Sequence, residues 1–111
     1  MKCIIQCSLP LLNKIQVITL NEDKIYYDDG RYERIVLNNK KEVDSLCSKL
    51  YDIAFSWKQE YIGDKVYGGE KYLIEFDVNH KRKKYKIQNK FPNNWDEFLL
   101  VRERILEMCG D

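Results

Sequence analysis

Only one histidine, His80, occurs in this chain of 111 residues. Ser-His-Asp catalysis, a Cys-His nucleophile pair and a histidine-rich metal site would all need this single side chain. It lies in a predicted hairpin turn beside the basic residues 81–84, where solvent would surround it. No serine lies in a nucleophile-elbow pattern, and no glycine run matches a phosphate-binding loop. We therefore expect a protein without catalysis and without a cofactor.

Cysteines are few, and their spacing does not suit a zinc site. They lie at positions 3, 7, 47 and 109, whereas a structural zinc ion needs four Cys or His ligands, usually in pairs two to four residues apart. Cys3 and Cys7 share one face of a predicted strand with Ile5 between them, an apolar row suited to a core. Cys47 and Cys109 each stand alone on a predicted helix. We therefore expect four thiols and no metal ion.

Long apolar runs are also absent. The first ten residues carry one charge, and Gln6 and Pro10 interrupt their apolar stretch. This stretch is too weak for a signal peptide and too short to span a membrane, so we expect a cytoplasmic protein with no membrane partner. Glycines number only five and prolines two, while 44% of the residues are apolar and 33% are charged. This composition is typical of a folded protein, and the length predicts a single domain over residues 1–111.

The chain has almost no excess of either charge, with 19 basic against 18 acidic residues. It therefore lacks the overall attraction to anions on which most nucleic-acid and membrane-surface binders rely, so any such binding would need a local patch. Lysine, asparagine, isoleucine and tyrosine are frequent, whereas alanine occurs once. This usage indicates the low-GC genome of a bacterium or a phage.

Alternating apolar and polar residues predict most of the strands. These are residues 2–7, 15–20, 24–27, 32–37, 72–78 and 84–88. The Asp28-Asp29-Gly30 segment is a strong turn signal, because Asp-Gly tolerates the positive φ of tight turns. The last two strands form a hairpin with one apolar and one charged face. Glycines interrupt residues 55–70, where we expect irregular structure with room for one strand.

Two amphipathic helices are predicted. The first covers residues 40–54, with Asn39 three residues before Glu42, at the spacing of a capping box. The last helix begins after Phe91 and Pro92, where Asn94 and Glu97 have the same spacing. Apolar residues at steps of three and four form a stripe that should face the core. Its members are Trp95, Phe98, Val101, Ile105, Met108 and Cys109.

These elements predict an α+β fold, in which an antiparallel, twisted sheet of five to seven strands carries two helices on one face. Both halves of the chain run strand, turn, strand and capped helix. That order raises the hypothesis of two ββα-like halves that arose by duplication. Coincidence is the simpler explanation, because units of two strands and a helix are common.

An acidic and aromatic patch is the first candidate for a protein interface. It consists of Tyr26, Asp28, Asp29 and Tyr32. Tyrosines are enriched in protein interfaces, because they bring a large contact area and a polar group at low entropic cost. Tyr27 shares its strand face with Ile25 and belongs in the core, which leaves Tyr26 as the exposed anchor. The alternative is that these tyrosines only pack on the sheet.

A basic run after the predicted turn is the second candidate. This basic patch consists of Lys81, Arg82, Lys83, Lys84 and Lys86. Its cations suit phosphates or an acidic partner, with Tyr85 available to stack on a base if its ring faces outward. The alternative is a solvated hairpin whose lysines prevent edge-to-edge pairing of sheets.

The second half of the chain also resembles a known sequence pattern. Trp57, Tyr61, the Gly68-Gly69 turn, the strand from Tyr72 and the segment 89–98 occur in the same order in a family of small uncharacterised bacterial domains. That family has the pattern W…Y…DG…W…N-x-[YF]-P-x-N-[WF]-x-x-F. The resemblance covers residues 57–105 and implies a fold, but it implies no catalytic residue. This chain departs from the pattern at 68–72, where the family has Asp-Gly and a tryptophan.

The sequence as a whole favours a non-catalytic protein-binding module. We expect a bacterial immunity or inhibitor-type protein, or a subunit of a small assembly. The alternative is a nucleic-acid-associated protein that uses the basic hairpin at residues 80–86.

Overall fold

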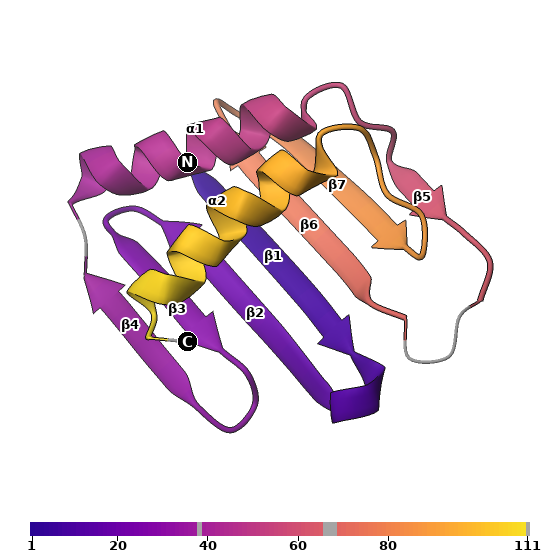
Figure 1. Cartoon of the computed structure of the whole chain (residues 1–111). Helices are drawn as coiled ribbons and strands as arrows, with labels where there is room; N and C mark the ends of the chain where they lie inside the picture. The colour runs from indigo at the N-terminus through magenta and orange to yellow at the C-terminus, as the bar shows by residue number, and fades with distance from the viewer. Residues whose placement is uncertain (38, 66–68, 111) are drawn as a thin grey trace.

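The computed structural model describes residues 1–37, 39–65 and 69–110. In these residues, seven strands form one sheet, and two helices lie together on one of its faces (Figure 1). The predicted α+β fold is therefore confirmed. The strands are β1 (Lys2–Leu9), β2 (Lys14–Asn21), β3 (Lys24–Asp28), β4 (Glu33–Leu37), β5 (Glu60–Ile62), β6 (Lys71–Val78) and β7 (Lys81–Gln88). The helices are α1 (Lys40–Ala54) and α2 (Trp95–Met108), and the short 3-10 turn η1 (Pro10–Leu12) joins β1 to β2.

The sheet has the strand order β4-β3-β2-β1-β6-β7-β5, so the first strand of the chain lies at its centre. All neighbouring strands are antiparallel except β5 and β7, which are parallel. The prediction of a wholly antiparallel sheet was therefore wrong at this edge, where the chain arrives from α1. The stretch 55–70 contains β5, as the prediction allowed, while residues 66–68 lie outside the described residues.

Alternate residues of the strands face the helices and form the core. On β1, for example, Cys3, Ile5 and Cys7 are at most 1% exposed, and their neighbours along the strand are only half-buried or exposed. The same alternation buries Ile74 and Phe76 on β6. The predicted period of two is thus confirmed, and it identifies the covered face of the sheet. None of the described helices is long and apolar enough to cross a membrane.

The two helices begin differently. Asn39 caps α1 as predicted, because its side-chain oxygen accepts a hydrogen bond of 2.7 Å from the Glu42 amide. Asn94 precedes α2 with a left-handed backbone, at φ 64°, and its side chain makes no capping hydrogen bond. The predicted capping box at α2 was therefore wrong. Aromatic packing fixes this end instead, since Trp95 stacks on Phe91 at 5.4 Å between ring centroids.

One position of the predicted α2 stripe was also wrong. Met108 is 37% exposed, whereas Arg102 is only 6% exposed. Arg102 follows Phe98 by four residues and precedes Ile105 by three, so helical periodicity places it on the inner face. The apolar pattern missed this residue because a charged side chain is rarely expected in a core.

Candidate protein-binding surface

The other face of the sheet carries no helix, and we call it the uncovered face (Figure 1). Its middle carries apolar side chains among polar ones. The register places Val17 of β2 and Leu73 of β6 on either side of Gln6 of β1 in one row of side chains. In the next row, Tyr26 of β3 lies beside Ile35 of β4. The members of this apolar patch are Ile4, Val17, Tyr26, Ile35 and Leu73.

The apolar patch is incompletely shielded from solvent. Leu73 is 37% exposed and Ile35 is 56% exposed, whereas the large apolar side chains on the opposite face of the same strands are almost fully buried. Antiparallel sheets commonly leave one face in water, but such a face usually carries polar side chains. Exposed apolar residues on one face are typical of a surface that binds another molecule, although here Gln6 and Thr19 lie between members of the patch.

Charged residues of opposite sign flank the apolar patch. Asp28 and Glu33 lie opposite each other on β3 and β4. On the far side of the patch, the basic residues Arg82, Lys84 and Lys86 point outward from β7 at alternate positions. On the uncovered face, Asp28 and Glu33 therefore lie on β3 and β4, and Arg82, Lys84 and Lys86 lie on β7, with Ile4, Val17 and Leu73 on the strands between them.

The structure divides the predicted acidic and aromatic patch between two faces. Tyr26 and Asp28 lie on the uncovered face. The Tyr26 hydroxyl donates a hydrogen bond to Glu33, and this bond raises the pKa of Tyr26. Tyr32 lies on the covered side, where its ring packs against buried Tyr27 at 6.1 Å and under the Arg34 guanidinium. The four residues therefore do not form one surface.

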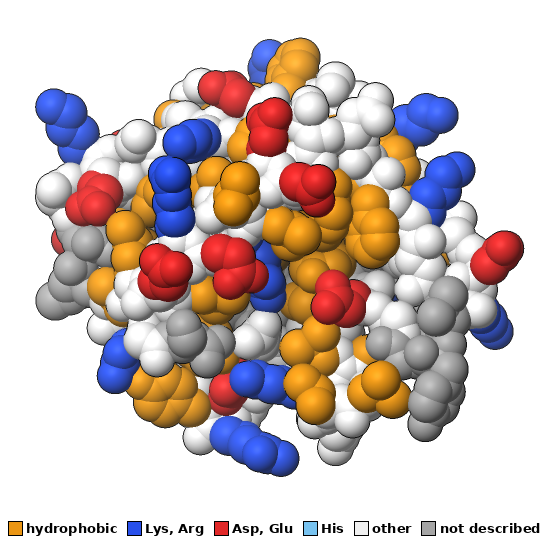
Figure 2. Space-filling model, in the orientation of Figure 1, with side chains coloured by type: hydrophobic (Ala, Val, Ile, Leu, Met, Phe, Trp, Pro, Cys, Tyr) orange, Lys and Arg blue, Asp and Glu red, His pale blue; other side chains and the backbone are white. Residues whose placement is uncertain are grey.

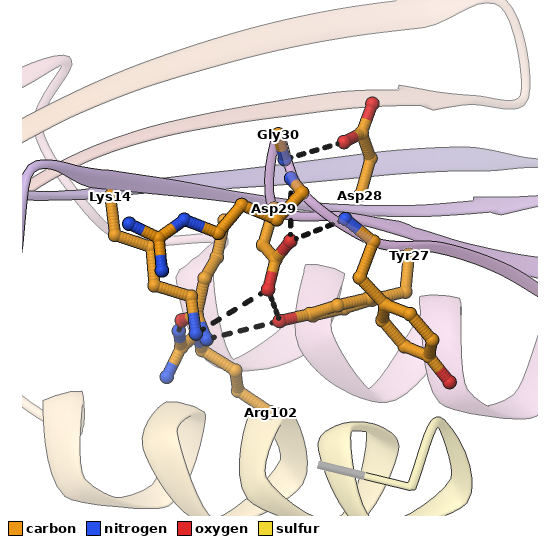
Figure 3. A network of polar contacts seen from close by, with 9 residues as sticks. Lys14, Tyr27, Asp28, Asp29, Gly30 and Arg102 are labelled. Atoms are coloured by element: carbon orange, nitrogen blue, oxygen red, sulfur yellow. Dashed lines mark hydrogen bonds and ion pairs between the residues drawn. The ribbon is translucent and has the colours of Figure 1, made fainter.

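Asp29, the fourth residue of that patch, is held inside a turn (Figure 3). Its carboxylate accepts hydrogen bonds from the backbone amides of Arg31 and Tyr32, at 3.0 and 2.9 Å. It also accepts one from the Tyr27 hydroxyl at 3.2 Å, and Lys14 lies 3.5 Å away. The backbone bond from Arg31 is the main cause that lowers the pKa of Asp29. Asp29 shapes the turn between β3 and β4 and is poorly placed to bind a partner.

A polar network leads from this turn to α2 (Figure 3). The Arg102 guanidinium donates to the Gln16 side-chain oxygen at 2.7 Å, and the Gln16 amide donates to the Tyr27 hydroxyl at 3.4 Å. Arg102 also lies over the Tyr72 ring, 5.7 Å from its centroid. The network joins α2 to β2, β3 and the β3–β4 turn, so it fixes this side of the sheet. The helical period of α2 could have predicted that Arg102 faces the sheet. Its hydrogen bond to Gln16 of β2 could not be predicted, because the two residues are far apart in the sequence.

The predicted basic patch is divided as well. Lys83 points to the covered side, where its ammonium lies 4.0 Å from the Phe55 ring centroid and donates to the Phe55 carbonyl at 3.3 Å. Tyr85 is 4% exposed, so its ring is not free to stack on a base. Arg82, Lys84 and Lys86 point to the uncovered face, whereas Lys81 shares the strand face of Lys83.

Acidic neighbours offset much of the charge on β7. Arg82 lies 3.6 Å from Asp77, and Lys84 lies 3.7 Å from Glu75, in both cases directly across the β6–β7 pair. Lys86 is opposite Glu60 in the register but forms no ion pair with another described residue. On the uncovered face of β7, a phosphate backbone would therefore meet two cations that neighbouring carboxylates offset, together with Lys86, which lies beside Glu60.

All four cysteines are buried thiols, as predicted. The thiols of Cys3 and Cys47 are in hydrogen-bond contact, which lowers the pKa of Cys47, whereas burial raises the pKa of Cys3 and of Cys7. A thiol with a raised pKa is a poor nucleophile at neutral pH. Among residues 1–37, 39–65 and 69–110, no three His, Cys, Asp or Glu side chains are grouped so that they could hold a metal ion. His80 is exposed in the turn between β6 and β7.

The outer surface of the helices is the other broad surface of the molecule (Figure 2). Acidic and basic side chains are scattered there around hydrophobic ones, which form a contiguous group to the right of the centre in this view. Phe55 and Leu100 are 57% and 65% exposed. Phe55 is already in contact with Lys83, whereas Leu100 projects from α2 into solvent.

Comparison with protein-family models, curated proteins and solved structures gives no match to this chain. The resemblance to the small bacterial domain family therefore stays a prediction, and function must be inferred from the geometry.

Proposed function

We propose that this protein is a non-catalytic protein-binding module, and that it binds its partner with the uncovered face of the sheet. The carrying observation is the apolar patch on that face, where Leu73 of β6 and Ile35 of the edge strand β4 remain 37% and 56% exposed. Covering such side chains removes apolar surface from water and favours association. The proposal keeps the role expected from the sequence, that of a bacterial immunity or inhibitor-type protein or a subunit of a small assembly.

The rigidity of the face supports this role. Every side chain of the apolar patch projects from a strand, and the opposite side of the same strands is fixed by the packed core. A surface that is already ordered loses little conformational entropy when a partner binds. Such a surface suits a partner that is equally rigid, and it places Tyr26 and Asp28 as specific contacts at one end of the patch.

The chemistry of the remaining candidates supports a role without catalysis. His80 is exposed at a hairpin turn, and the cysteines lie in the core, where burial raises the pKa of Cys3 and Cys7. Cys47, whose pKa is lowered by its hydrogen bond with Cys3, is 0% exposed and is therefore closed to a substrate.

Site-specific photo-crosslinking tests the proposal. A photoreactive phenylalanine analogue replaces Leu73 on the uncovered face, and the matched control carries it at Leu100 on α2, which is more exposed. We expect a protein adduct from position 73 that position 100 does not give, with the partner identified by mass spectrometry. Equal crosslinking at the two positions, or no protein adduct at position 73, would refute the proposal.

The nucleic-acid alternative has weaker support, because Asp77 and Glu75 lie beside Arg82 and Lys84. A mobility-shift titration at low salt tests it with single- and double-stranded DNA and RNA. Phosphate binding by β7 should weaken steeply as salt is added and should be lost when Lys86 is changed to Glu. The absence of a shift at low salt would remove this alternative.

A further inference from the structure

We propose that the open edge of β7, residues 81–85, is a second binding site, which takes up an extended, acidic segment of another protein as an additional strand of the sheet. This site is separate from the apolar patch and goes beyond the function proposed for it. β7 pairs with β6 along its whole length, but it pairs with β5 only over residues 86–88. Residues 81–85 therefore form a stretch of sheet edge that β5 does not reach (Figure 1).

The backbone of the open edge carries hydrogen-bonding groups that point away from the sheet. Where β5 is present, the Lys86 N–H points to this side and donates to the Gln59 carbonyl at 2.8 Å. Backbone groups of alternate residues point to the same side of a strand, so the N–H and C=O of Arg82 and Lys84 also point away from β6. Among the described residues, no backbone group bonds to them on this side. Such groups are a template for pairing with another strand.

A cavity of about 380 Å³ lies beside the open edge. Its lining comes from β7 and from the segment between α1 and β5, and consists of Trp57, Gln59, Arg82, Lys83, Lys84 and Tyr85. The Trp57 and Tyr85 rings pack edge to face on the covered side, 5.7 Å apart between centroids. An added strand would place alternate side chains on the two sides of the sheet. Apolar side chains suit the side of these rings, and acidic side chains suit the side of Arg82 and Lys84.

Charge determines which strand fits the open edge. Residues 81–84 are four consecutive cations. The side chains of Arg82 and Lys84 are 83% and 75% exposed. Their ion pairs with Asp77 and Glu75 run toward β6, on the opposite side of β7 from the open edge, and pairs between such exposed side chains are weak. Acidic residues of an added strand can therefore form cross-strand pairs with these cations.

A second copy of this chain does not suit the open edge. Two copies of β7 side by side would bring the cations of residues 81–84 together, and like charges opposite each other are destabilising. The outer strand β4 begins with one acid and one base, Glu33 and Arg34, and continues with apolar residues. Lysines on an edge commonly prevent pairing between sheets. The same lysines select an acidic segment, because opposite charge replaces repulsion with attraction.

Fluorescence anisotropy of a labelled peptide tests this site in the full chain. The probe is a hexapeptide of alternating glutamate and valine, and the control peptide has lysine in place of glutamate. At low salt, we expect saturable binding of the acidic peptide, about tenfold or more tighter than that of the control, which weakens as salt is added. The absence of saturation at submillimolar concentrations of the chain, or equal binding of the two peptides, overturns the proposal.

Methylation of the probe's backbone separates strand pairing from simple attraction between charges. In an extended peptide, the glutamate N–H groups point to one edge and the valine N–H groups point to the other. N-methylation of either set keeps the charge of the peptide, but only one set faces β7. We expect one methylated peptide to lose binding and the other to keep it. Equal effects of the two methylations overturn the proposal.

Substitutions at Lys84 test the position of the site. Lys84→Gln removes one charge, whereas Lys84→Pro also removes the outward N–H, which the pairing with β6 does not use. We expect about threefold weaker binding of the acidic peptide to Lys84→Gln, and about tenfold or more weaker binding to Lys84→Pro. Glu75→Gln leaves Lys84 uncompensated and should strengthen binding.

The matched control is Lys86→Gln, which removes the same charge where β5 already occupies the edge. It should weaken peptide binding less than Lys84→Gln does. Circular dichroism shows whether the variants are folded. Equal binding by folded Lys84→Pro and Lys84→Gln, or a larger effect of Lys86→Gln than of Lys84→Gln, overturns the proposal.

The two proposed sites fail independently. A chain that binds the acidic peptide but gives no protein adduct from position 73 keeps the open edge as a site and overturns the function proposed for the uncovered face. A chain that gives the adduct but does not bind the peptide overturns the site at the open edge and leaves the uncovered face intact.

Discussion

The two faces of the sheet are built from alternate residues of the same strands, yet they differ sharply. On the covered face of β6, Ile74 and Phe76 are at most 2% exposed. Leu73, which precedes Ile74 and points to the uncovered face, is 37% exposed. The covered face is closed by α1 and α2, and its packing maintains the fold. The uncovered face contributes little to that packing and is available for association. The comparison predicts that substitutions will separate stability from binding according to the face that they alter.

The largest expected loss of stability comes from the aromatic cluster on the covered side. Phe98 is fully buried, and its ring centroid lies 5.2 Å from that of Trp57 and 5.5 Å from that of Trp95. Phe98→Ala should lower the free energy of unfolding by about 3–5 kcal/mol, measured by urea denaturation. Leu100→Ala, on the outer side of the same helix, should change it by less than about 0.5 kcal/mol. Similar losses from both variants would contradict the assignment of the core.

A smaller loss is expected at the polar network. Arg102→Ala should cost about 2 kcal/mol in the free energy of unfolding, because it leaves a gap and removes the donor of the buried Gln16 oxygen. Arg102→Met fills the gap with apolar atoms and should cost about half as much. If methionine proved as damaging as alanine, the hydrogen bond rather than the filled volume would govern stability here.

Alkaline pH should weaken the covered face through its buried phenols and thiols. Burial is the main cause that raises the pKa of Tyr72, Tyr85, Cys3 and Cys7. The unfolded chain therefore releases these protons first, near the ordinary pKa values of 9.0 for Cys and 10.0 for Tyr. The contribution of these groups to the free energy of unfolding is fully present below about pH 9, and it should fall as the pH rises above that value. Urea denaturation at several pH values checks this, and Tyr72→Phe should reduce the slope above pH 10.

A substitution on the uncovered face should weaken binding and leave the stability of the fold nearly unchanged. Val17→Glu places a charge in the middle of the apolar patch but removes nothing from the core. The free energy of unfolding of the monomer should change by less than about 1 kcal/mol, whereas photo-crosslinking from position 73 should fall strongly. A large loss of stability with unchanged crosslinking would reverse the roles assigned to the two faces.

The smallest effect is expected from the ion pairs of β7. The Lys84–Glu75 pair, at 3.7 Å, joins two well-exposed side chains. Glu75→Gln should therefore change the free energy of unfolding by less than about 0.5 kcal/mol. The same substitution leaves Lys84 uncompensated, so a mobility shift that appears only in this variant would indicate that Glu75 normally prevents binding of nucleic acid.

Local patterns were sufficient to predict most of the fold. The period of two identified the covered face of β1 and β6, and the cap at Asn39 fixed the start of α1 at the correct residue. Both signals depend on residues that are close in the sequence. The parallel pairing of β5 with β7 has no such local signal, because it depends on where the chain reaches the sheet after α1.

The candidate surface was harder to predict. Tyr26 and Asp28 were identified correctly as residues of one strand face, because strand parity separates them from Tyr27. The alternation along residues 72–78 correctly placed Leu73 with Glu75 and Asp77, opposite Tyr72 and Ile74. The patch that Leu73 forms with Val17 was not predicted, because only the strand order brings β2 and β6 to the two sides of β1. Tyr32 was wrongly predicted to share a surface with Tyr26 and Asp28, because the turn at Asp29 directs its side chain to the covered side.

The central position of β1 also has a consequence for how the chain folds. β1 leaves the ribosome first and can pair early with β2, but its second edge must wait for β6, about seventy residues later. The pairing of distant segments slows folding, because the chain loses entropy on closing a long loop before the new contacts stabilise it. During that interval, the unpaired edge of β1 can accept a foreign strand. We therefore expect aggregation during synthesis to depend on how quickly residues 71–78 arrive, and the completed sheet removes this risk.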